Sequence, residues 1–166
     1  MKVFFEQIKS DGLKIDTKFE FEYLDSHIVV ENFTGDIYPI KKGYFLDGMV
    51  TFSVKSACDR CTEIVQKGFS ERIQLEIVRD FSEDTEEEKE LTEEDLSFYK
   101  ITDDYIEIDD IIKEEVTLLK PMKWLCKEGC KGICPGCGAD LNREKCSCTA
   151  DFIDPRLEVL KKLKNK

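Results

Sequence analysis

The sequence has little histidine and no long apolar run. Its single histidine, His27, lies far from the cysteines, which disfavours a catalytic zinc ion, because such an ion keeps one position open for water and usually takes histidine or carboxylate ligands. No apolar stretch approaches the roughly 20 residues of a membrane-spanning helix, and the first residues, MKVFFEQIKSDG, lack the apolar core of a secretory signal. We therefore expect a cytoplasmic chain that does not enter a membrane and whose cysteines stay reduced.

Basic residues are scarce in the middle of the chain, whose formal net charge is −11 overall. Residues 80–115 hold 3 Lys and Arg against 17 Asp and Glu, whereas residues 1–79 hold 11 against 13 and residues 120–166 hold 11 against 6. Such a polyanionic segment repels RNA phosphates and attracts basic proteins. Two interpretations of it stay open: a solvated acidic linker, or a surface that offers a phosphate-like field to a basic partner.

Cysteine, by contrast, is abundant, with eight residues in four close pairs. Six lie in CKEGCKGICPGCGADLNREKCSC, and the other two form the motif CDRC much earlier in the chain. Zn²⁺ binds four thiolates in a tetrahedron, and cysteines two to four positions apart let one turn supply two of them. The sequence therefore predicts two zinc sites with four cysteine ligands each. The eight ligands are Cys58, Cys61, Cys126, Cys130, Cys134, Cys137, Cys146 and Cys148.

The motif CPGCG, at residues 134–138, is typical of a zinc knuckle. Gly136 and Gly138 permit the positive-φ turn that directs backbone amides at the two sulfurs. Cys146 and Cys148 are the natural complement of this motif, because they are the next pair along the chain. The sequence thus predicts one metal site contained within the last third of the chain.

By elimination, Cys126 and Cys130 share the second metal with the CDRC pair, so that this ion would join the two halves of the chain. The reverse pairing stays open. A redox-active dithiol is a further interpretation, although such a motif usually starts a helix, whereas CDRC follows a strand-like run. Inert, buried cysteines are the remaining one.

Alternation of apolar and polar residues predicts strands in the first half of the chain. In residues 17–23, three aromatic side chains alternate with three charged ones. The same period predicts strands at residues 1–9, 28–33, 36–40, 44–55 and 64–80, with CDRC in the turn between the last two. His27 falls within this region, where we expect a solvent-facing or packing role.

The period changes in the second half. Residues 81–104 are rich in glutamate and aspartate and poor in aliphatic side chains, which predicts a mobile acidic loop with a helical turn at residues 93–98. A short strand is predicted next, at residues 105–108. Apolar residues at helical spacing then predict a helix, which Asp109 or Asp110 caps and Pro121 stops. A second helix is predicted at the C-terminus, where Asp154 can cap and Pro155 fits the first helical position.

These elements predict one α+β domain. We expect an antiparallel β-sheet, open or barrel-like, with a packed helix, a C-terminal cysteine-rich zinc knuckle and a C-terminal helix. Residues 1–80 would form the sheet with its CxxC hairpin, residues 81–104 the acidic loop, and residues 105–166 the helix, the knuckle cluster and the second helix.

The order and spacing of four motifs resemble the YceD family, described as large ribosomal RNA subunit accumulation proteins of bacteria and plastids. The motifs are CDRC after a strand, IDDIIKEEVTLLKP, CPGCGADLN with C-x-C, and the closing DPR-x-x-x-L. One departure is Thr62, where the family often has leucine. The resemblance implies a cytoplasmic role in the processing or stability of large-subunit ribosomal RNA, with no established catalytic activity.

We therefore expect a non-catalytic zinc-binding factor in ribosome assembly, which acts as an adaptor for a basic ribosomal or processing protein. A zinc-ribbon module that binds RNA weakly through the basic C-terminal part is the first alternative. Its contacts would be Lys120, Lys123, Lys127, Lys131, Arg143 and Lys145. A thiol redox protein is the second. A nuclease is disfavoured, because the abundant acids form a run without the spacing of a catalytic constellation.

Overall fold

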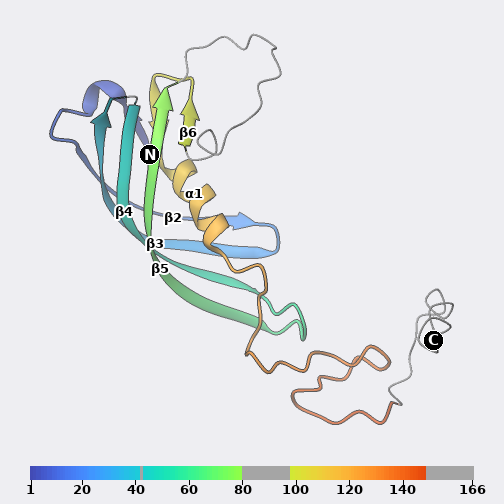
Figure 1. The fold of residues 1–166 in the computed structure, drawn as a ribbon. Helices are drawn as coiled ribbons and strands as arrows, with labels where there is room; N and C mark the ends of the chain where they lie inside the picture. The colour runs from blue at the N-terminus through green and yellow to red at the C-terminus, as the bar shows by residue number, and fades with distance from the viewer. Residues whose placement is uncertain (42, 80–97, 149–166) are drawn as a thin grey trace, which may run out of the picture. The chain divides into compact units, whose positions relative to one another are not determined.

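The computed structural model of the chain describes residues 1–41, 43–79 and 98–148, and the chain divides into two compact units. Unit 1 comprises Met1–Ser56 and Gln66–Met122, and unit 2 comprises Ala57–Val65 and Lys123–Lys166. Unit 1 holds the helix and most of the strands, whereas the described part of unit 2 consists of loops and turns apart from strand ends and one isolated β-bridge (Figure 1). Within the described residues, no helix is both long and apolar enough to cross a membrane.

Two sheets and one α-helix make up the regular structure of the described residues. The elements are β1 (Lys2–Phe4), a 3₁₀ turn (Phe5–Gln7), β2 (Leu13–Tyr23), β3 (Ser26–Ile40), β4 (Gly43–Ala57), β5 (Ile64–Arg79), β6 (Phe98–Ile101), β7 (Tyr105–Glu107) and α1 (Ile108–Leu119). The large sheet has the order β2-β3-β4-β5-β6, and β1 pairs with β7 in a separate antiparallel ribbon. The expected strands at residues 28–33 and 36–40 are one continuous strand, β3.

The large sheet is mixed, so the expectation of a purely antiparallel sheet is wrong. Strand β6 runs parallel to β5, from the pair Glu76 and Phe98 to the pair Arg79 and Ile101. A parallel neighbour requires a crossover connection of a dozen or more residues, and residues 80–97 separate the two strands. Alternation does not reveal β6, because only four residues form it, at the end of a segment whose acidic composition favours a loop.

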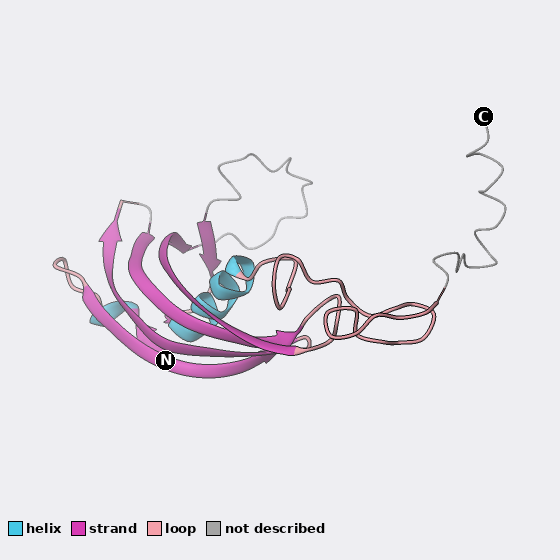
Figure 2. Ribbon diagram, turned by 90° about the horizontal axis from the view of Figure 1, so that it is seen from below, coloured by secondary structure: helices cyan, strands magenta, loops and turns pink. Residues whose placement is uncertain are grey.

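The sheet of unit 1 curls around α1 (Figure 2). The pairing register shifts between Thr17 and Phe19 on β2, and again between Val30 and Asn32 on β3. Such bulges bend a strand and increase its twist, which curves the sheet toward the helix. The largest fully buried side chains are Phe33, Phe52, Ile15, Ile28, Ile37, Leu46, Ile73, Ile77, Ile106, Ile108, Ile111 and Ile112. Unit 1 therefore has a complete aliphatic core of its own.

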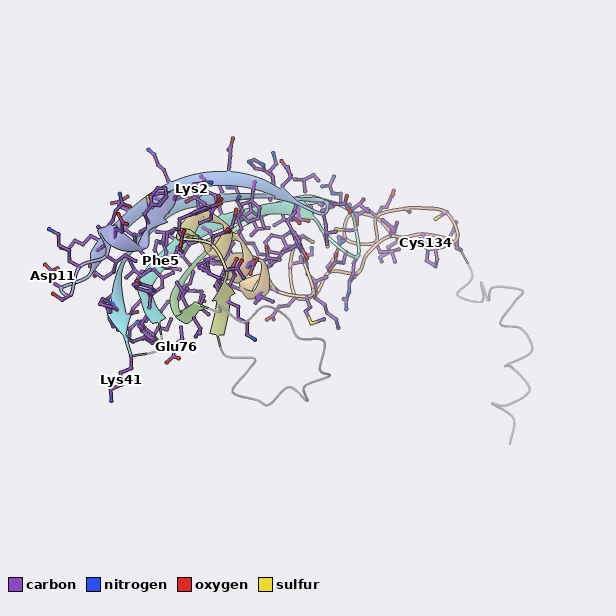
Figure 3. All side chains as sticks on the ribbon, turned by 90° about the horizontal axis from the view of Figure 1, so that it is seen from above. Lys2, Phe5, Asp11, Lys41, Glu76 and Cys134 are labelled. Carbon is purple, nitrogen blue, oxygen red and sulfur yellow. The ribbon has the colours of Figure 1, made fainter. Side chains whose placement is uncertain are left out.

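The first residues of the chain pack within unit 1; Figure 3 labels Lys2 and Phe5. The Lys2 ammonium lies 4.1 Å from the ring centroid of Tyr105 and 3.0 Å from a carboxylate oxygen of Glu107. The Phe5 ring stacks on Tyr44, with centroids 4.9 Å apart. Of the strand expected at residues 1–9, Lys2–Phe4 form β1, and Lys9 forms an isolated bridge with Gly12.

Neither of the two expected aspartates caps α1. Glu107 occupies the N-cap position and makes no side-chain capping hydrogen bond. Asp109 instead accepts hydrogen bonds from the Met1 ammonium at 2.5 Å and from the Thr17 hydroxyl at 3.1 Å. The reason is tertiary: β7 leads directly into the helix, so no turn residue precedes it, and long-range donors reach the carboxylate.

Two other expected elements fall on residues that are not described. The C-terminal helix lies wholly outside the described residues. The helical turn expected at residues 93–98 also lies outside them, apart from Phe98, which begins β6. The helix α1 itself is confirmed, and it ends at Leu119, two residues before Pro121.

Candidate metal centres

Four sulfurs from distant parts of the sequence meet in unit 2. Cys58 and Cys61 lie in the turn between β4 and β5, and Cys126 and Cys130 follow α1. Their Sγ atoms all lie within 4.8 Å of one another. The Sγ atoms of Cys58 and Cys130 are 3.8 Å apart, and those of Cys61 and Cys126 are 3.6 Å apart. We call this group site 1.

The spacing of these sulfurs matches a metal centre rather than disulfides. Sulfurs placed about 2.3 Å from a central zinc ion in a tetrahedron lie roughly 3.8 Å from each other, whereas a disulfide brings them to about 2.0 Å. All eight cysteines of the chain are free thiols. Site 1 therefore offers four soft donors at the separation that zinc requires.

Site 1 is also the hydrophobic core of unit 2. Cys58, Cys61 and Cys130 are 1%, 7% and 2% exposed, and the partly buried Leu125 and Cys126 pack against them. The core of unit 2 thus consists mainly of cysteine side chains, whereas that of unit 1 consists mainly of aliphatic side chains. A core of this size cannot hold a loop-rich segment by apolar burial alone, because burial stabilises in proportion to the area removed from water.

The charged residues of CDRC tie its turn to the segment after α1. Asp59 accepts a hydrogen bond from the Trp124 backbone N–H at 2.6 Å and donates its own N–H to the Trp124 carbonyl at 2.8 Å. The Arg60 guanidinium donates to the Cys130 carbonyl at 2.7 Å. These contacts of Asp59 and Arg60 hold the two cysteine pairs at one place.

Backbone amides prepare one sulfur of site 1 for metal binding. Burial by itself would raise the pKa of Cys58, but N–H groups of Arg60, Cys61 and Cys126 donate to its sulfur and bring its pKa down to about 6. For Cys61, the Glu63 backbone N–H favours the thiolate, yet burial and the neighbouring cysteines raise the pKa to about 12. Adjacent thiolates repel each other, and a divalent cation removes that penalty.

Asn142 is a site residue that the sequence argument missed. Burial opposes ionisation of Cys130, but the Asn142 side-chain amide, 3.4 Å from the sulfur, and the Gly132 backbone N–H lower the pKa of this thiol. The Asn142 Oδ1 atom accepts from the Lys131 backbone N–H at 2.9 Å. Its position in the motif CGADLN, twelve residues after Cys130, carries no local signal for this contact.

The remaining four cysteines form a second group, which we call site 2. The Sγ atoms of Cys134, Cys137, Cys146 and Cys148 lie within 4.8 Å of one another, and those of Cys134 and Cys146 are 3.5 Å apart. Cys134 is buried, whereas Cys137 and Cys148 are exposed. Figure 3 labels Cys134 on the loop segment that follows α1. Site 2 is therefore more open to solvent than site 1.

The two glycines of the knuckle have different tasks. Gly138 adopts the expected positive φ of 77° and donates its N–H to the Cys134 carbonyl at 2.8 Å. Gly136 does not have a positive φ, so the expectation for it is wrong. Backbone N–H groups of Cys137 and Gly136 donate to the Cys134 sulfur and lower its pKa to about 6. A side chain at Gly136 would begin 3.4 Å from the Cys148 sulfur.

The structure thus brings together all eight cysteines, in the two groups that the spacing argument proposed. Each group consists of four sulfur donors with N–H groups directed at a sulfur, and this donor set fits a structural Zn²⁺ ion. That the groups bind zinc stays a prediction.

The basic residues considered for RNA binding divide between the units. Lys120 belongs to unit 1 and donates to the Ser26 hydroxyl at 2.6 Å. The other five are exposed in unit 2: Lys123, Lys127, Lys131, Arg143 and Lys145. His27 belongs to unit 1, where its two ring nitrogens lie 2.7 Å from a Glu22 carboxylate oxygen and 3.6 Å from one of Glu20.

The profile of the family described as large ribosomal RNA subunit accumulation protein YceD matches residues 46–164. The chain belongs to the YceD family. The matched range includes both cysteine sites of this YceD chain and begins within β4. The description of the family refers to the accumulation of large-subunit ribosomal RNA.

Curated relatives span both bacteria and plants. The YceD chain is 28% identical over 144 residues to the large ribosomal RNA subunit accumulation protein YCED homolog 1, chloroplastic, of Arabidopsis thaliana. The aligned region covers 72% of this chain and 44% of the Arabidopsis protein. The chain is 29% identical over 117 residues to an uncharacterized protein of Mycobacterium tuberculosis, with 70% and 54% covered. The YceD chain thus spans about half the length of these relatives. No solved structure matches it.

Proposed function

We propose that this YceD chain is a non-catalytic, zinc-binding factor that supports processing and accumulation of large-subunit ribosomal RNA as an adaptor for a basic ribosomal or processing protein. The observation that carries the proposal is the completeness of the two sites. Each offers four sulfurs, so a zinc ion there has no open position for water or substrate. Zinc would shape unit 2 and leave binding to the protein surface.

The charge of the sites favours a basic protein as the direct partner. A zinc ion with four thiolates is net negative, because two positive charges meet four negative ones. Residues 120–166 hold 11 basic and 6 acidic side chains, so their side chains are net positive. The negative charge of two zinc–thiolate sites would nearly cancel this positive charge. The acidic segment at residues 80–115, with 17 acidic and 3 basic side chains, then dominates the electrostatic field.

Binding of the chain to purified large-subunit ribosomal proteins at graded salt tests this role. The test variant replaces five glutamates with glutamine: Glu86, Glu87, Glu88, Glu93 and Glu94. The matched control makes the same charge change at five exposed acids of unit 1: Glu6, Asp11, Asp16, Glu31 and Asp36. We expect salt-sensitive binding that the test variant weakens and the control retains. Equal affinity of the test variant and the wild type would reduce the segment to a solvated linker.

Direct RNA binding is a second candidate, because five basic side chains of unit 2 are exposed. Filter binding with large-subunit ribosomal RNA fragments distinguishes it. Phosphate contacts would make the logarithm of affinity fall steeply with the logarithm of salt concentration, and replacing Lys123, Lys127, Lys131 and Lys145 with glutamine would flatten that slope. The adaptor role predicts weak binding with no change of slope.

A further inference from the structure

A groove opens on unit 1 where β2 and α1 run side by side. Two residues of a strand advance about 6.6 Å and four residues of a helix about 6 Å, so alternate residues of β2 can face every fourth residue of α1. Thr17 bonds to Asp109 at 3.1 Å, and the Lys113 ammonium lies 5.8 Å from the Phe19 ring centroid. Beyond these contacts, the seam widens into a groove of about 510 Å³.

The groove is lined mainly by apolar atoms, and its lining is solvent-accessible. It is formed by Phe21, Glu22, Tyr23, Lys113, Glu114, Thr117 and Leu118. Leu118 is 79% exposed and Tyr23 is 40% exposed. Leu118, on the last turn of α1, does not contribute to the core of unit 1, to which the helix supplies the buried side chains of Ile108, Ile111, Ile112 and Val116.

The turn beside the groove adds a second observation. Leu24, the residue after Tyr23, has a φ of 51° and is 81% exposed. The left-handed region is unfavourable for a residue with a branched side chain, and glycine or asparagine would fit this two-residue turn better. Because the Leu24 side chain is exposed, burial of apolar surface in unit 1 does not offset this backbone strain. A strained, exposed leucine therefore points to a contact outside the folded unit.

The charge around the groove selects its occupant. Glu22 and Glu114 lie on its rim, while the Lys113 ammonium is held by Asp110 at 2.8 Å and His27 lies against Glu22. Unit 1 as a whole holds 14 basic and 28 acidic side chains. A cationic peptide is thus attracted to this unit before its apolar side chains make contact.

We propose that this groove binds a basic amphipathic segment of the partner protein, whose leucine-like side chains contact Tyr23 and Leu118 and whose lysines or arginines meet Glu22 and Glu114. The inference rests on the proposed adaptor role, in that the partner is a basic protein. The groove would be a second contact for the partner, in addition to the acidic segment, and it would bind in the helix-in-groove manner of other complexes.

The test uses the full zinc-loaded chain and a synthetic lysine–leucine peptide of helical period, with a glutamate–leucine peptide of the same pattern as charge control. We expect NMR chemical-shift changes at Phe21, Tyr23, Thr117 and Leu118 when the lysine–leucine peptide is added, and none when the glutamate–leucine peptide is added. Leu118→Ala should weaken binding of the lysine–leucine peptide about tenfold through the lost apolar contact. Met49→Ala, at a 48% exposed site on β4, should retain the wild-type affinity within twofold. Equal binding of both peptides, or shift changes elsewhere, would overturn the proposal.

Two further results separate the possible failures. If purified ribosomal proteins bind the wild type and Leu118→Ala equally, while the five-glutamine variant binds them less, the adaptor role stands and the groove is excluded. A second variant of the full chain, with serine at positions 157, 160 and 163 in place of the three leucines, tests whether the chain's own basic C-terminal segment occupies the groove. A severalfold gain in peptide affinity in that variant would show that the chain fills its own groove, which would overturn binding of a partner segment.

Discussion

Individual cysteines were predictable as site residues because thiolates bind zinc through their own chemistry and close spacing. The contacts that support them were not. Asn142 and Arg60 each reach Cys130 from a distant position in the chain, through a side-chain amide and a guanidinium respectively. Neither residue type is specific to metal sites, so their role follows only from where the fold places them.

We predict that Asn142→Ala lowers the zinc affinity of site 1 by about 10–100-fold, the usual effect of removing a hydrogen bond to a metal ligand. The variant removes the donor 3.4 Å from the Cys130 sulfur. Competition with a chromophoric chelator measures the change. Arg143→Ala is the control, since this guanidinium, next in the chain, pairs with Glu63 at 3.0 Å and with Asp140 at 3.3 Å and makes no hydrogen bond to a sulfur among the described residues. An equal effect of both variants would assign the loss to general destabilisation.

At the scale of elements, alternation predicted the long strands well and their boundaries less well. The expected strands at residues 28–33 and 36–40 form one strand, β3, in which Gly35 pairs with Gly48 of β4. A Cβ atom at Gly35 would lie 2.7 Å from the Gly48 Cα atom. The two backbones approach more closely than side chains permit. Glycine at these positions therefore marks a close approach of two strands.

We predict that Gly48→Ala lowers the free energy of unfolding of unit 1 by about 1–3 kcal/mol, the typical cost of overpacking. The added Cβ atom would meet the Phe33 ring at 2.6 Å. Gly68→Ala on β5 is a matched control, because its nearest neighbour is 4.0 Å away. That change should be neutral or slightly stabilising. Urea unfolding followed by far-ultraviolet circular dichroism measures both, and similar losses would contradict the packing argument.

The whole molecule combines a unit with an aliphatic core and a unit whose core is sulfur. The described part of unit 2 has Trp124, buried to 2% exposure, and the cluster around site 1 as its main apolar content. The binding energy of a structural zinc ion, on the order of 10 kcal/mol or more at neutral pH, would then become folding energy of unit 2.

We predict two zinc ions per chain and local unfolding when a chelator removes them. Backbone amides of residues 57–65 and 123–148 should lose hydrogen-exchange protection, while α1 and the central strands retain theirs. Cys58→Ser and Cys137→Ser should each lose one zinc ion, and Cys58→Ser should expose the CDRC turn because it removes a core sulfur. Metal analysis and exchange mass spectrometry report these results. A Cys58→Ser variant with two ions and normal protection would refute site 1.

The sequence by itself determined the local features of this protein. Period-two alternation predicted the strands that form β2 to β5 of the large sheet, helical spacing predicted α1, and the ligand chemistry of closely spaced cysteines predicted two groups of four, because each of these signals lies within a few neighbouring residues. Only the tertiary structure decided the rest. The parallel placement of β6, the bonds of Asp109 to Met1 and Thr17, and the groove beside Leu118 depend on segments far apart in the chain. Their proximity arises from packing a curled sheet around a helix, which no short stretch of sequence encodes.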